Sequence, residues 1–115
     1  MGITRIKLVV IWTAMVQGIS SAWATVPNYP VENWCDRVAR SAGPRSEVIY
    51  GGCTRNEQLA YDRLKIEWDA TPSTAQSWCD QVARSVGPGS YELLLGCLDN
   101  EAQAARQNKS QPFER

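Results

Sequence analysis

Apolar residues recur along this chain with the spacing of α-helices, and they do so in two copies of one pattern. In the first copy a short apolar face precedes residue 43, and a longer one runs from residue 49 to about residue 68. Gly43-Pro44 separates the two faces and is typical of a helix end, because glycine suits the left-handed position after a helix and proline cannot continue it. No stretch keeps the strict alternation of a β-strand. The two faces consist of Trp34, Cys35, Val38, Ala39 and Ala42, and then of Ile49, Cys53, Asn56, Ala60 and Leu64.

The second copy of the pattern lies 44 residues further along the chain. Residues 34–65 and 78–109 align without a gap, and 16 of the 32 aligned positions are identical. Such self-similarity indicates one supersecondary unit that is used twice. Each unit therefore predicts two antiparallel helices joined by a Gly-Pro turn.

Polar residues at the expected helix starts predict caps. Ser46 and Ser90 follow the two Gly-Pro turns, and a serine hydroxyl at such a position accepts a hydrogen bond from a free backbone N–H of the helix. Ser73, followed three residues later by Gln76, predicts a capping box at the start of the third helix.

The four cysteines are spaced for one disulfide within each hairpin. Cys35 and Cys53 lie at nearly equal distances from their turn, and Cys79 and Cys97 repeat that relation. Residues equally far from the turn of an antiparallel hairpin face each other, so these pairings are favoured among the three that four cysteines allow. A zinc site or a redox dithiol is the alternative, but both normally show Cys-x-x-Cys, whereas seventeen residues intervene here.

Residues beside the cysteines suggest how the helices approach. Gly52 and Gly96 precede the second cysteine of each pair, and a missing Cβ would let two helices come to disulfide distance. Trp34 and Trp78 precede the first cysteine of each pair and are expected to pack over the disulfides.

The first residues of the chain have the pattern of a secretory signal peptide. Arg5 and Lys7 form a basic region, residues 8–16 are almost all apolar, and Ala22-Trp23-Ala24 supplies small residues for cleavage. We therefore predict a signal peptide over residues 1–24 and a mature chain that begins at Thr25. The predicted localisation is periplasmic or secreted, without stable membrane insertion after cleavage.

The sequence thus predicts an all-α fold of two tandem disulfide-pinned antiparallel helical hairpins, packed as one small domain. The first repeat spans residues 30–70 and the second spans residues 72–109, within a mature domain of residues 25–115.

Composition excludes several classes of function. Without Arg5 and Lys7 of the predicted signal peptide, ten basic residues remain against twelve acidic ones, which gives the mature chain a net charge of −2. The sequence also shows no basic stripe, so we predict no nucleic-acid partner. The chain contains no histidine, the commonest general base and the usual ligand of catalytic zinc. We therefore predict no enzymatic activity, no catalytic residue, no metal and no cofactor.

An aspartate and an arginine four residues apart occur in both repeats. Asp36 with Arg40, and Asp80 with Arg84, have the spacing of an exposed ion pair on a helix surface. The alternative is a doubled carboxylate site to which each repeat contributes one acid.

An Asn-Glu dipeptide also occurs in both repeats, as Asn56-Glu57 and Asn100-Glu101. Counting outward from the first disulfide places Asn56 and Glu57 opposite the start of the first helix, where backbone N–H groups lack partners. We predict structural caps at these four residues, with a ligand-binding or catalytic role as the alternative.

The first repeat has an apolar stripe that the second lacks. Tyr61, Leu64 and Trp68 extend beyond their own hairpin, and three such side chains would form an exposed apolar patch unless something covers them. Either the second hairpin folds back over the stripe, or the stripe is an interaction surface for a homodimer or another protein.

The motif Cys-x-x-Val-Ala-Arg, followed by Gly-Pro-x-Ser and Cys-x-x-Asn-Glu, resembles uncharacterised small exported proteins of Gram-negative bacteria that carry Cys-x17-Cys helical-hairpin repeats. The resemblance covers residues 34–109. It implies a periplasmic location and carries no catalytic residue to this chain.

The expected function is that of a periplasmic or secreted, non-enzymatic interaction or structural protein. Its expected partner is an unknown protein or envelope component, and a homodimer is one of the predicted forms. The alternatives are a secreted inhibitor or effector that binds an envelope component, and a carboxylate-based hydrolase.

Overall fold

The computed structural model describes Gly2 and residues 25–115, so the predicted signal peptide lies outside the described residues apart from Gly2. Every regular element of the described chain is a helix, which confirms the predicted all-α fold. The elements are α1 (Val31–Ala39), α2 (Glu47–Glu67), the short 3-10 helix η1 (Trp68–Ala70), α3 (Ser73–Arg84) and α4 (Tyr91–Ser110).

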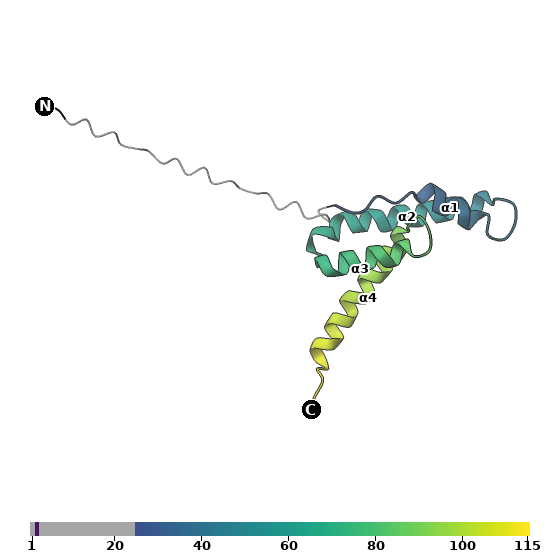
Figure 1. The fold of residues 1–115 in the computed structure, drawn as a ribbon. Coiled ribbons are helices and arrows are strands. Elements are labelled where there is room, and N and C mark those ends of the chain that lie inside the picture. The colour runs from purple at the N-terminus through teal and green to yellow at the C-terminus, as the bar shows by residue number, and fades with distance from the viewer. Residues whose placement is uncertain (1, 3–24) are drawn as a thin grey trace.

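The four α-helices form the two predicted hairpins (Figure 1), α1 with α2 and α3 with α4. Disulfides join Cys35 to Cys53 and Cys79 to Cys97, with Cα–Cα distances of 5.6 and 5.5 Å. Both pairings are the predicted ones. Disulfides persist in oxidising compartments, so the two bonds indicate such an environment for this chain. Contacts between α2 and α4 join the two hairpins to each other.

Serine side chains begin the second helix of each hairpin, as the sequence predicts. Ser46 Oγ accepts a hydrogen bond from the backbone N–H of Ile49, and Ser90 Oγ accepts one from Leu93, both over 3.3 Å. Each hydroxyl satisfies one of the free N–H groups of its helix.

The predicted capping box at the start of α3 is wrong. Pro72 is the N-cap residue of α3, and no side chain caps this end of the helix. The buried Gln76 instead donates from Nε2 to the carbonyl oxygen of Trp68, over 2.8 Å. Gln76 therefore helps to fix the connection between the hairpins, because its bond joins α3 to the Trp68 carbonyl of η1, which also accepts the backbone N–H of Thr71 over 3.0 Å.

The role expected for Gly52 and Gly96 is also wrong. A Cβ atom built on either residue would meet no atom within 4 Å, so their absent side chains do not set the helix separation. Gly89, in the turn before α4, is in contrast required by its surroundings. Its φ of +109° disfavours other residues, and a Cβ there would lie 2.7 Å from the ring of Tyr29.

The hydrophobic core lies between the second hairpin and the C-terminal half of α2. It therefore belongs to both hairpins and fixes their packing as one domain. Its buried members are Tyr29, Ala60, Leu64, Trp68, Cys79, Ala83, Tyr91, Leu94 and Leu98.

An extended segment before α1, residues 25–30, lies across the second hairpin; we call it the strap. Tyr29 donates from its hydroxyl to Asp80 Oδ1 over 2.6 Å, and its backbone N–H donates to the hydroxyl of Tyr91 over 2.9 Å. The Tyr91 hydroxyl in turn donates to the carbonyl of Pro27, over 2.8 Å. These bonds connect the start of the described domain to α3 and α4.

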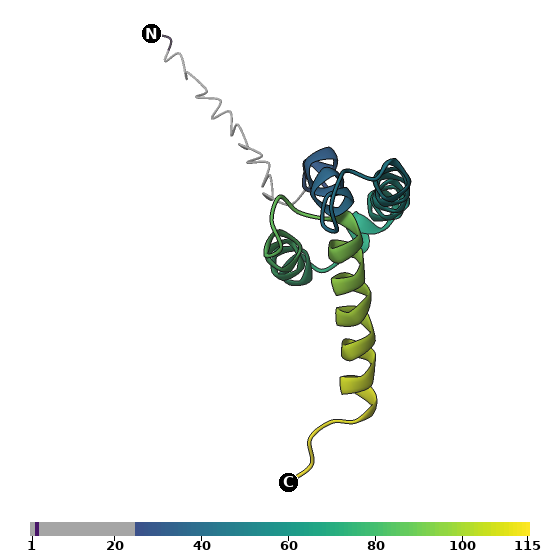
Figure 2. The same cartoon turned by 90° about the vertical axis from the view of Figure 1, so that its right-hand side faces the viewer.

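The outer half of α4 leaves the body of the domain (Figure 2). Every residue from 99 to 110 is exposed, although the helix continues to Ser110. None of the helices in the described part of the chain is both long and apolar enough to cross a membrane.

Candidate functional site

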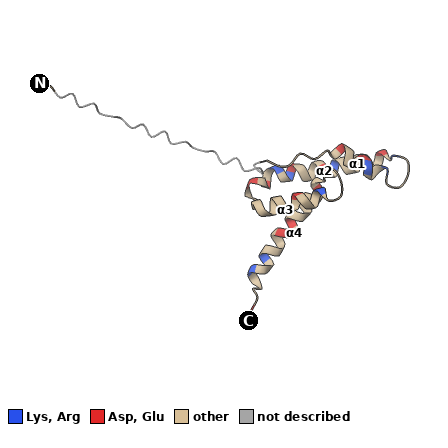
Figure 3. Ribbon diagram, viewed as in Figure 1, with Lys and Arg blue, Asp and Glu red and all other residues tan. Residues whose placement is uncertain are grey.

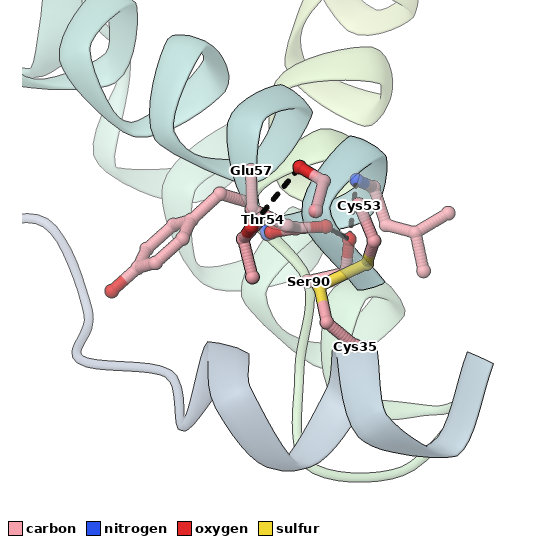
Figure 4. Close-up of a disulfide and its surroundings, with 8 residues drawn as sticks. Cys35, Cys53, Thr54, Glu57 and Ser90 are labelled. Carbon is pink, nitrogen blue, oxygen red and sulfur yellow. Dashed lines mark hydrogen bonds between the residues drawn. A yellow bond between two sulfur atoms is a disulfide. The ribbon is translucent and has the colours of Figure 1, made fainter. Parts of the chain in front are cut away.

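The carboxylate of Glu57 is completely buried between the two hairpins, close to the Cys35–Cys53 disulfide (Figure 4). Its Oε1 accepts a hydrogen bond from Ser90 Oγ over 2.5 Å, and its Oε2 accepts one from the backbone N–H of Tyr91 over 2.6 Å. Tyr91 is the first residue of α4, so a negative charge lies at the positive end of that helix dipole. Glu57 therefore caps α4 of the other repeat. The sequence-based prediction that it caps the start of α1 is wrong.

The other three residues of the two Asn-Glu dipeptides lie in different surroundings. Asn56, Asn100 and Glu101 are exposed, and none of their side chains makes a hydrogen bond or ion pair within the described part of the chain. The equivalence of the repeats is thus lost at this position: Glu57 faces α4, whereas Glu101 lies on the outer half of α4.

The two Asp-Arg pairs also differ. Asp36 and Arg40 form the predicted surface ion pair, with Arg40 Nε 3.0 Å from Asp36 Oδ2 and both side chains well exposed. Asp80, in contrast, is buried beneath the strap. It accepts hydrogen bonds from the hydroxyl of Tyr29 and from Arg84 Nε, the latter over 3.0 Å. Burial and the hydrogen bond to Asp80 raise the pKa of Tyr29 far above its ordinary value. The phenol is therefore neutral and acts as a donor.

The stripe of Tyr61, Leu64 and Trp68 is covered by the second hairpin. Leu64 and Trp68 are 1% and 2% exposed, and the Tyr61 ring lies 4.8 Å from the ring of Tyr91 between their centroids. The residues that the sequence offers as an interaction surface therefore form part of the core, which corresponds to the first of the two arrangements considered for them.

The tryptophans beside the cysteines do not behave alike. Trp34 is half-buried, but Trp78 is 54% exposed on the outer side of α3. Trp78 lines a shallow, open depression with Ser73, Thr74, Ser77 and Gln81.

A larger depression lies where α3 and the outer half of α4 diverge; we call it the α3–α4 groove. It has a volume of about 500 Å³, and Leu64 and Leu98 of the core contribute to its lining. The remaining lining is mainly small and apolar, with Ala70, Pro72, Ala75, Ala102 and Ala105 among its residues. This groove is the candidate functional site, because its lining is mostly apolar and yet open to solvent.

Three carboxylates line the groove, and one arginine neutralises two of them. Arg63 binds both oxygens of Asp99, at 2.8 and 3.0 Å, and its Nε lies 3.1 Å from Glu67. Glu101 remains as the one lining carboxylate without an ion-pair partner among the described residues. The groove therefore offers an apolar surface with a single unpaired negative charge beside it.

The charged groups inside the domain are engaged in internal bonds. Glu57 and Asp80 are the two carboxylates buried in the described chain, and each already holds two donors from the protein. No group of three His, Cys, Asp or Glu side chains in residues 25–115 is arranged to hold a metal ion. What the groove offers is an apolar surface on which another molecule could be buried.

Sequence reasoning missed three residues that connect the hairpins and hold the groove in place: Tyr29, Gln76 and Ser90 as a partner of Glu57. Two signals could have found them. Gly89 stands in the second turn where the first repeat has Arg45, which indicates that another group approaches the backbone there. The inner face of a helix that packs only on an apolar core carries apolar residues, so a glutamine at position 76 on that face of α3 indicates a polar contact.

Comparison of the chain with protein-family models, with curated proteins and with solved structures found no match.

Proposed function

We propose that this chain is an exported, non-enzymatic protein that works in the periplasm or outside the cell by associating with another protein through the α3–α4 groove. The observation that carries the proposal is the groove itself, an apolar depression of about 500 Å³ that no part of the described chain fills. Apolar surface that stays open on so small a domain is typical of a protein-binding site.

Two further observations support this proposal. The internal bonds of Glu57 and Asp80 leave neither carboxylate placed to act on a substrate, so the hydrolase alternative gains no support from them. The two disulfides, the predicted signal peptide and the resemblance to exported proteins all favour a location beyond the cytoplasmic membrane.

A capture experiment with matched variants tests the proposal. A tagged full chain is expressed in Gram-negative cells that also make an untagged copy, and bound proteins are recovered with disulfides intact. Ala102→Arg places a large charged side chain in the groove, whereas Ala104→Arg changes a residue of the same helix that does not line it. We expect one dominant partner, either the untagged chain or another protein, with wild type and Ala104→Arg but not with Ala102→Arg.

Equal recovery with all three baits would show that the groove is not the binding site, and recovery of no partner by any bait would contradict the proposal altogether. The intact mass of the same bait tests export, because a mature chain should begin at Thr25. A mass that retains residues 1–24 would contradict the predicted cleavage.

A further inference from the structure

We propose that the occupant of the α3–α4 groove is a second copy of this chain, with the outer halves of two α4 helices antiparallel and centred on Ala105. The proposal rests on the proposed function, since it takes the groove as a protein-binding site and names its partner. The contact would be isologous, so that the same residues act twice across a two-fold axis.

The first argument is the continuity of one face of α4. Leu94 and Leu98 are buried in the core, and Ala102, Ala105 and Lys109 follow on the same face at helical spacing. Ala102 and Ala105 line the groove but are exposed. The face that packs inside the domain thus continues beyond it, with small side chains that allow another helix to approach closely.

The second argument is the order of charges along the outer half of α4. Acidic residues lie where the helix leaves the body, and basic residues lie toward its C-terminal end (Figure 3). In an antiparallel pair centred on Ala105, residues equally far from it face each other, which places Lys109 opposite Glu101 of the partner subunit. Neither Glu101 nor Lys109 has an ion pair within the described residues. Two copies in this arrangement therefore satisfy two pairs of unpaired charges.

The third argument is the residue that follows the helix. Phe113 is 86% exposed, and it comes shortly after α4 ends at Ser110. The same antiparallel arrangement places Ser110, the last residue of α4, opposite Asn100 of the partner subunit, so the segment that carries Phe113 leaves the helix toward the groove. An aromatic ring is suited to fill such an apolar depression.

The outer half of α4 also has few contacts within the domain that would stabilise it as a helix. Beyond Asp99, which Arg63 holds, residues 100–110 form about three fully exposed turns, and isolated helices of this length are marginal in water. Packing against a second copy would stabilise them. One helix face and one aromatic ring make a small interface, below about 1,200 Å² in total, so we expect dissociation constants in the micromolar range.

Sedimentation of the purified mature chain, from about 1 to 500 µM, tests the proposal, because this range spans micromolar affinities. Wild type should pass from monomer to dimer. Ala105→Arg should weaken the dimer by about tenfold or more, because it overfills the centre of the contact. Ala104→Arg adds the same side chain on a face that does not line the groove, and it should change the dissociation constant by less than about twofold.

A charge reversal tests the antiparallel register. Glu101→Lys and Lys109→Glu should each weaken the homodimer, since like charges then face each other in both pairs. An equimolar mixture of the two variants should form a heterodimer about as tight as the wild-type homodimer, because both pairs become attractive again. A mixture that associates no better than either variant alone would overturn the register.

The results separate this inference from the proposed function. A wild-type chain that stays monomeric over the whole range, or a dimer that Ala105→Arg leaves intact, would overturn the inference. If the chain is monomeric but a different protein is captured through Ala102, the proposed function holds and only the identity of the partner is wrong. If the chain is monomeric and no partner is captured, both proposals fail.

Discussion

Replacement of Glu57 by glutamine keeps the size of the buried side chain but removes the charge that caps α4. Glu57 holds Ser90 Oγ on one oxygen and the Tyr91 N–H on the other. A glutamine oxygen can accept only one of these donors, while its NH₂ group faces the other, so one bond is lost and the second loses its charge. A hydrogen bond to a charged group contributes about 1.5–3 kcal/mol to stability.

The attraction between the carboxylate and the start of α4 adds about 0.3–1 kcal/mol. Relief from burying a charge offsets part of the loss, because desolvation of an ion is unfavourable. We therefore expect Glu57→Gln to lower the free energy of unfolding by about 2–3 kcal/mol.

Guanidinium unfolding followed by circular dichroism, with disulfides intact and at low protein concentration, measures this change. The matched control is Glu101→Gln, the equivalent position of the second repeat, which is exposed and unpaired. A surface change of this kind should stay within about 0.5 kcal/mol of wild type. The Tyr91 amide should also exchange faster in Glu57→Gln. If the two variants unfold within about 0.5 kcal/mol of each other, the carboxylate does not stabilise α4 as we reason.

Two other changes test the packing of the strap. Tyr29→Phe removes the bond to Asp80 and should destabilise the domain by about 1.5–3 kcal/mol at pH 7. The folded-state pKa of Tyr29 is raised, so the contribution of its hydroxyl is full below the unfolded-state pKa of about 10 and declines above it. The difference in unfolding free energy between variant and wild type, measured in urea, should therefore shrink from pH 9 to pH 11. A difference that stays constant with pH would contradict this assignment. Gly89→Ala should lower the melting temperature, because its Cβ would meet the Tyr29 ring at a positive φ. Gly52→Ala, in open space within α2, should instead stabilise the domain by up to about 1 kcal/mol. Equal effects of the two substitutions would contradict the described packing.

The parts of the fold that the sequence predicts are those that depend on local geometry. The Cys35–Cys53 and Cys79–Cys97 pairings follow from helical spacing on either side of a short turn, and the Ser46 and Ser90 caps lie at the helix starts that the Gly-Pro turns mark. Such features need no knowledge of how one hairpin packs on the other.

The partner of Glu57 could not be predicted in this way, because it depends on packing between the repeats. Sequence equivalence suggests one role for Glu57 and Glu101. The two hairpins, however, pack asymmetrically through α2 and α4, so Glu57 is buried between them and Glu101 is exposed. The burial of Asp80 has the same origin, since the strap covers the second repeat and leaves Asp36 at the surface. The α3–α4 groove likewise arises from the divergence of two helices, which no spacing of residues in the sequence encodes.

The strap has a consequence for the order in which the chain can fold. Tyr29 finds its partners 51 and 62 residues downstream, in α3 and at the start of α4. Because a chain is synthesised from its N-terminus, the strap emerges long before α3 and α4, the helices that it binds, have been made. The first hairpin can close alone through its disulfide, but the tyrosine contacts must wait until α4 has emerged. Completion of the core is thus delayed until the last helix has been made, because the contacts that close it are distant in the sequence.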